Sequence, residues 1–252
     1  MKEREPSNKG ETEFLTQQQL EAFAHRFVLR KKVAQALLLT AGKAAPGLDV
    51  VKPDGIREYG FAEFQFEWYQ EGIWKQALLF SSLFKGKEEE IALTREYKNF
   101  ITGLRLAVTS PGLSKPVLFF HTHPYLPQFS NILRFSEDDL HSFVSQIEDK
   151  GNTKLIEGVG VTHNGSSEEM AMAELLLVSF KDFYSFREFA PRGTYGKSVE
   201  YLKVPGKHPY DAYREAGLHV AHAVFPLRQT ALITETPPQG WIERTPAVSG
   251  SC

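Results

Sequence analysis

The chain has 252 residues, of which 42% are hydrophobic and 24% are charged. This ordinary globular composition excludes an intrinsically disordered or fibrous protein. The chain carries 29 basic and 31 acidic side chains, a net charge of -2, so no basic surface is predicted and nucleic acid is not an expected partner. Cys252 is the only cysteine, which excludes a disulfide framework and a thiolate zinc site. No apolar run is long enough to span a membrane, and we expect a soluble cytoplasmic protein without a membrane partner.

The first predicted helix begins after a polar segment, residues 1–15, which we expect to be a flexible tail. Thr16 is a suitable N-cap, and Gln19 three residues later completes a capping-box pattern before apolar residues at helical spacing. The stop signal Pro46-Gly47 ends the pattern, but basic residues in its middle also allow two helices in place of one.

The central part of the chain changes to strand patterns. From Phe61, aromatic and acidic residues alternate, and a short glycine-bearing turn leads into a second apolar run, which predicts a β-hairpin. Residues 88–108 have apolar side chains at roughly helical spacing and predict a helix. Residues 116–123, "PVLFFHTH", are apolar and short, which predicts a strand.

The remaining elements complete an α+β pattern. Ser136 as N-cap predicts a helix after the central strand, and residues 155–180 read as two strands joined at Asn164-Gly165. Residues 209–225 are predicted as one helix, followed by an extended tail over 234–252. The order of helix, hairpin, helix, strand, helix and hairpin predicts a mixed β-sheet flanked by helices.

Two histidines stand at the end of the predicted strand, in "FFHTHP". Side chains at i and i+2 of a strand point to one side, so His121 and His123 can reach one metal ion. Imidazole suits zinc, and a catalytic zinc site usually has three protein ligands. The segment "SEDDL" supplies Ser136 and Asp139 at a helix start, although a serine N-cap with an acid at this spacing is also ordinary helix chemistry.

The other histidines fit surface or packed positions better than ligand positions. The motif "HVAH", with His219 and His222, has the i, i+3 spacing that could bind a metal on a helix. No carboxylate partner for it stands out from the sequence. His141 and His163 likewise have no evident ligand partners.

The pattern "HTHP", a loop and "SEDD" resembles the HxHP…SxxD signature of the JAMM/MPN (JAB-type) zinc metalloprotease family, in its prokaryotic branch. The resemblance implies that His121, His123 and Asp139 bind Zn²⁺ and that Ser136 assists the tetrahedral intermediate. The loop before the aspartate is about five residues longer than the family pattern, an insertion that costs little when both ends are anchored. Asp138 is the nearest competitor for Asp139.

The resemblance also implies a general base, which is a glutamate on an upstream strand. Glu63 is preferred because it precedes a turn and a return strand at the family's spacing, and Glu58 and Glu67 remain alternatives. The implied JAMM/MPN-like catalytic domain covers residues 16–185, with a C-terminal extension of unknown role over 186–252.

The function that the resemblance implies is zinc-dependent hydrolysis of an isopeptide or peptide bond next to a ubiquitin-like protein, which would be the partner and substrate. Two other interpretations are open. The first is a catalytically inactive MPN-type scaffold. The second is another metal hydrolase with an HxH ligand pair, although the barrels of that class need many βα units after the motif.

Overall fold

The structure of the chain is a computed structural model. None of the helices in the part of the chain that it describes is long and apolar enough to cross a membrane. The described residues are 13–28, 30–41, 58–70, 73–81, 83–85, 113–123, 133–148, 151–164, 171–185, 208–226 and 242–243.

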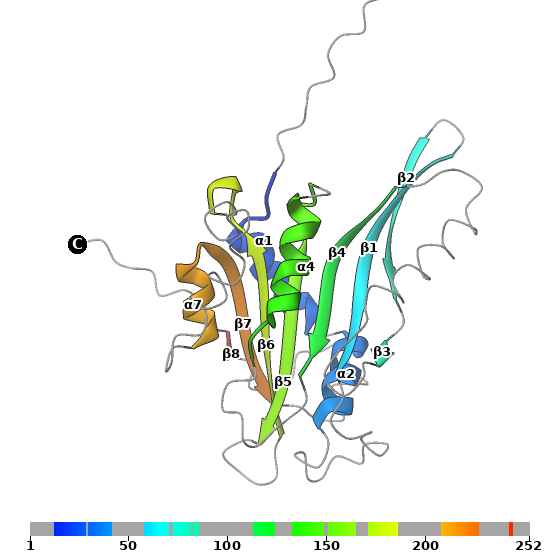
Figure 1. The fold of residues 1–252 in the computed structure, drawn as a ribbon. Helices are drawn as coiled ribbons and strands as arrows, with labels where there is room; N and C mark the ends of the chain where they lie inside the picture. The colour runs from blue at the N-terminus through cyan, green and yellow to red at the C-terminus, as the bar shows by residue number, and fades with distance from the viewer. Residues whose placement is uncertain are drawn as a thin grey trace, which may run out of the picture.

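Within these residues, one mixed sheet of eight strands forms the centre of the molecule, in the order β2-β1-β4-β5-β6-β7-β8 with β3 beside β1 (Figure 1). β4 and β5 are parallel and the other neighbours are antiparallel, which confirms the general α+β class. The strands are β1 (Tyr59–Gln70), β2 (Ile73–Phe80), β3 (Phe84–Lys85), β4 (Leu113–Thr122), β5 (Ile156–Asn164), β6 (Ala171–Phe180), β7 (Leu218–Pro226) and β8 (Ile242–Glu243).

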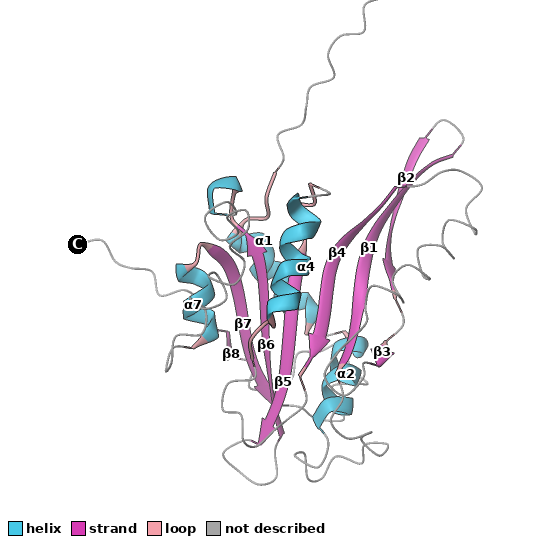
Figure 2. Cartoon of the chain, viewed as in Figure 1, coloured by secondary structure: helices cyan, strands magenta, loops and turns pink. Residues whose placement is uncertain are grey.

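Helices cover both faces of the sheet (Figure 2). The helices α1 (Gln17–Phe27) and α2 (Lys31–Ala41) pack on one face, and α4 (Glu137–Glu148) and α7 (Pro209–Glu215) on the other. Successive residues of β4 alternate between the two cores, because strand side chains point to opposite faces. Phe120 packs against α1, with its ring centroid 5.1 Å from that of Phe27, while Phe119 joins the core under α4.

The helix predicted after Thr16 forms as two elements. Thr16 caps α1 with the predicted capping box, in which its side chain accepts from the backbone of Gln19 and the Gln19 side chain accepts from the backbone of Thr16. α1 ends at Phe27 and α2 begins at Lys31, so the basic residues mark the break between them.

The prediction of one helix over residues 209–225 is wrong. α7 ends after Glu215, and Gly217 has a φ of +86°, a conformation that residues with a Cβ adopt with strain. The chain then enters β7, which pairs with β6 along its whole length. The sheet therefore continues past residue 185 into the segment predicted as a C-terminal extension.

Several other predictions fall on residues outside the described part of the chain. These are the helix predicted over 88–108, the turn at Asn164-Gly165 beyond its first residue, and most of the terminal segments 1–15 and 234–252. Within the last of these, Ile242–Glu243 form β8, which pairs with β7.

Candidate metal centre

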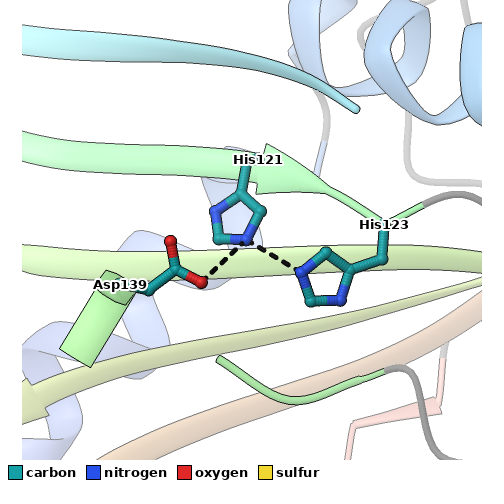
Figure 3. Close-up of side chains that lie close together, drawn as sticks. All are labelled: His121, His123 and Asp139. Atoms are coloured by element: carbon teal, nitrogen blue, oxygen red, sulfur yellow. Dashed lines mark hydrogen bonds and ion pairs between the residues drawn. The ribbon is translucent and has the colours of Figure 1, made fainter. Parts of the chain in front are cut away.

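The two histidines of "HTHP" lie at the carboxyl end of β4 and point to the same side of the sheet (Figure 3). Their Nε2 atoms are 3.1 Å apart. The backbone N–H of His123 donates to the carbonyl of Gly160 on the parallel neighbour β5, at 2.9 Å, which continues the strand pairing past the end of β4. The side chains of His121 and His123 are 3% and 14% exposed, so both remain within a partly buried site.

Asp139 completes the group from the first turn of α4. Its Oδ2 atom lies 3.4 Å from Nε2 of His121. Ser136 orients this carboxylate, because its backbone N–H and its hydroxyl donate to Oδ2 at 2.8 and 2.7 Å. In return the N–H of Asp139 donates to the Ser136 hydroxyl at 3.1 Å, an N-capping bond. The neighbour Asp138 is exposed and does not belong to the group.

Two of the three separations between the donor atoms are close to those of a tetrahedral metal site. Zinc binds imidazole nitrogen and carboxylate oxygen at about 2.0–2.1 Å, and two ligands of a tetrahedron at that distance are about 3.3–3.4 Å apart. The measured separations, 3.1 Å between the histidines and 3.4 Å between His121 and Asp139, are close to this value. His121, His123 and Asp139 therefore form a group that can hold a metal ion.

The electrostatics of the site favour a cation. Burial disfavours the charged form of His121, but the charge and hydrogen bond of Asp139, with a contribution from Glu58, raise its pKa above the ordinary value. Burial also disfavours the charged form of Asp139, yet His121 and the hydrogen bonds of Ser136 hold its pKa well below the usual range. Asp139 is therefore ionised at neutral pH, as a metal ligand must be.

Glu58 is the glutamate that the fold brings to this group. Tyr59 pairs with Thr122 and Gly60 with His121 in the antiparallel ladder of β1 and β4, so Glu58 stands opposite His123. Its Oε1 atom is 3.8 Å from Nε2 of His123, and its side chain is 15% exposed. Glu58 thus borders both the ligand group and solvent.

The structure does not bring Glu63, the preferred base in the sequence analysis, to the metal group. Glu63 pairs with Leu118, whose side chain faces α1 and α2, on the side of the sheet away from His121. It is fully buried and forms an ion pair with Arg30. Glu67 lies farther along β1, about 30 Å from Glu58 at the usual rise of a strand, and accepts from the side chain of Gln65.

A further acidic residue, Glu157, lies on the same face of the sheet. It is 4% exposed and sits on β5 opposite Phe119 of β4. Burial, with the nearby charge of Asp139, raises the pKa of Glu157 well above the usual value. Glu157 therefore stays protonated in conditions where an exposed glutamate is charged.

A second group of possible ligands was not predicted. Glu174 on β6, His208 before α7 and His222 on β7 bring their ligand atoms within 4.8 Å of one another. From the sequence, His222 is predicted only as part of a helical "HVAH" motif without a carboxylate partner. The short, mostly apolar run "LHVAHAVF" between Gly217 and Pro226 would have indicated a buried strand, in which His222 and a residue of a neighbouring strand can meet.

Comparison with known proteins adds no relative. The chain matches no protein-family model, no curated protein and no solved structure at a significant level.

Proposed function

We propose that the chain is a JAMM-type zinc metallopeptidase that hydrolyses an isopeptide or peptide bond next to a ubiquitin-like protein. The observation that carries the proposal is the placement of Glu58 beside a three-ligand group of His121, His123 and Asp139. Two imidazoles and one carboxylate with an adjacent glutamate are the parts of a hydrolytic zinc site.

When bound, zinc would act as a Lewis acid that polarises the scissile carbonyl and lowers the pKa of its bound water. Glu58 has the position of the general base. Its carboxylate borders the ligand group at the solvent side, where it can take a proton from the attacking water and pass it to the leaving amine. Glu63 has no access to the site, and its carboxylate is paired with Arg30.

Ser136 supports the site in a different way from the one that the family resemblance implies. Its hydroxyl donates to Asp139 at 2.7 Å and so orients a ligand. Partners of this kind fix the direction of a ligand and strengthen metal binding. Donation to an oxyanion would require the hydroxyl to leave Asp139, so we assign Ser136 a positioning role.

The substrate class rests on the resemblance of "HTHP" and "SEDD" to the family signature. The test is cleavage of isopeptide-linked ubiquitin-like conjugates and of C-terminally extended ubiquitin-like proteins by the zinc-loaded chain. Wild type should cut at least one of these. Glu58→Gln should lower the rate by about a hundredfold or more with unchanged zinc content, because an amide cannot take the proton.

The matched control is Glu67→Gln, which removes a glutamate from the same strand far from the metal group and should leave the rate unchanged. An uncleaved panel of substrates, with zinc bound, would favour the inactive scaffold over the peptidase. Equal rates for wild type and Glu58→Gln would remove Glu58 from the mechanism.

A further inference from the structure

We propose that Glu174, His208 and His222 form a second zinc site that joins α7 to the sheet. The assignment of this site does not rest on the proposed peptidase function. Its donors are two imidazoles and one carboxylate, a set that suits zinc with water in the remaining position. The three residues come from β6, from the N-cap of α7 and from β7, so one ion would connect three elements.

The donor atoms already converge. The Oε1 atom of Glu174 lies 3.1 Å from Nε2 of His208 and 2.5 Å from Nε2 of His222. The two imidazole rings are 4.9 Å apart between centroids. Both histidines therefore direct the same kind of nitrogen at one carboxylate oxygen, as they would around a shared ion.

The burial of the group favours a specific site over a chance surface cluster. His222 is 3% exposed, and its Nδ1 atom is buried without a hydrogen-bond partner. The side chains of Glu174 and His208 are 18% and 29% exposed, which leaves a path for an ion and a water. Burial disfavours the charged carboxylate, but hydrogen bonds from both histidines lower the pKa of Glu174 to about 2, so it is charged at neutral pH.

In the absence of metal the group is a hydrogen-bonded cluster. Nδ1 of His208 accepts from the N–H of Tyr210, so its Nε2 atom carries the proton that is donated to Glu174. The 2.5 Å contact of Glu174 with His222 is a short hydrogen bond, closer than the roughly 3.3 Å between two ligands of a tetrahedral zinc. Zinc would bind at Nε2 of His208, the ring proton would move to Nδ1, and the cap bond from Tyr210 would therefore be lost.

Two consequences follow from this exchange. Binding should weaken as the pH falls, because protons compete with zinc for the imidazole nitrogens. The loss of the cap bond of His208 should also lower the affinity of this group for zinc.

The second group is too far from the first to share an ion. His121 pairs with Val159, Val159 with Leu176, and Leu176 with His222, so three strand steps separate the two histidines. At the usual strand spacing this is about 14 Å, whereas two-metal sites need about 4 Å. The second ion would thus not form a two-metal centre with the first. Because it would connect β6, β7 and the start of α7, we assign it a structural role.

The second ion would also affect the first site, because α7 contacts the segment that leads into Asp139. Tyr213 on α7 is buried, and its hydroxyl accepts from the backbone N–H of Phe135 at 3.0 Å, one residue before Ser136. The rings of Phe135 and Tyr213 are 5.5 Å apart. An ion that holds α7 on the sheet would therefore steady the segment that leads into Asp139.

The test is the number of zinc ions per chain in the full-length protein, measured by metal analysis after dialysis against zinc. His123→Ala removes a ligand of the first group and isolates the second. In that background His208→Asn keeps an N-capping side chain but removes the imidazole, and Glu174→Gln removes the charge with little change of shape. His219→Asn is the matched control, because His219 lies on β7 but belongs to neither group.

We expect about one zinc in His123→Ala and in its combination with His219→Asn, and none above background in the combinations with His208→Asn or Glu174→Gln. Zinc should also raise the melting temperature of His123→Ala but not of His123→Ala with His208→Asn. A His123→Ala protein without zinc, or a zinc count that neither His208→Asn nor Glu174→Gln changes, would overturn the second site. Because its count is read in the absence of the first site, failure of the peptidase proposal would leave this result intact.

Discussion

Oε1 of Glu58 and Nε2 of His123 lie 3.8 Å apart, although Glu58 precedes β1 and His123 follows β4, far away in the chain. The antiparallel register of β1 and β4, with Tyr59 opposite Thr122, places Glu58 directly across from His123. This relationship places a glutamate beside the two histidines and Asp139, and it is the reason that we propose a hydrolytic site.

The ligand role of Asp139 can be separated from that of its neighbour. Asp139→Asn should lose about one zinc per chain, because the amide carries no charge and is a weaker ligand than the carboxylate. Asp138→Asn should keep the wild-type zinc content, since Asp138 is exposed and outside the group. Metal analysis of the two purified variants makes the comparison, and loss of zinc in Asp138→Asn alone would mean that the register of "SEDD" is wrong.

Removal of the Ser136 hydroxyl should weaken zinc binding without abolishing it. In Ser136→Ala the carboxylate of Asp139 loses one of the two hydrogen bonds that Ser136 donates to it. The expected decrease in zinc affinity is about 10- to 100-fold, with a loss of about 1 kcal/mol in stability from the missing N-cap. Ser136→Thr, which retains a hydroxyl, should recover most of both. Zinc titration measures the first effect and thermal unfolding the second.

Glu63→Gln should act on stability and not on the metal site. The substitution leaves Arg30 beside a neutral amide on the buried face, and breaking such a pair costs about 2 kcal/mol when one partner is partly exposed. The folded variant should keep both its zinc and its hydrolytic activity. Denaturant unfolding together with metal analysis tests this, and an inactive but fully stable Glu63→Gln protein would restore Glu63 as the base.

Glu157 should make the stability of the protein dependent on pH. Burial raises its pKa in the folded chain, so its stabilising contribution is complete below the unfolded pKa near 4.5 and is lost as the pH rises through the folded pKa. Glu157→Gln removes the ionisable group. The melting temperature of the variant should therefore exceed that of wild type at pH 7 and approach it near pH 4, and parallel curves across this range would contradict the assignment.

The residues of the candidate metal group could be predicted because each depends on a local pattern. His121 and His123 share a face through the period of two of a strand, and Ser136 with Asp139 follows the ordinary spacing of a helix start. The general base could not be chosen in the same way. Glu58 and Glu63 point to opposite faces, and only the register of β1 against β4 determines which of them meets the histidines.

In the fold, too, features that depend on nearby residues could be predicted, and features that depend on distant residues could not. The capping box of Thr16 and the hairpin of β1 with β2 follow from nearby residues. Residues 209–225 are predicted as one helix, but Gly217 and the pairing of β7 with β6 make the part after α7 a strand. The cluster of Glu174, His208 and His222 could not be predicted without this pairing.

The central claim is that His121, His123 and Asp139 hold zinc. The most direct measurement is metal analysis of the purified full-length protein beside its His121→Ala variant, with His141→Ala as the control for loss of an exposed histidine. We predict that wild type and His141→Ala carry the same amount of zinc and that His121→Ala carries about one ion fewer per chain, because one of three protein ligands is missing. Equal zinc content in all three proteins would contradict the account.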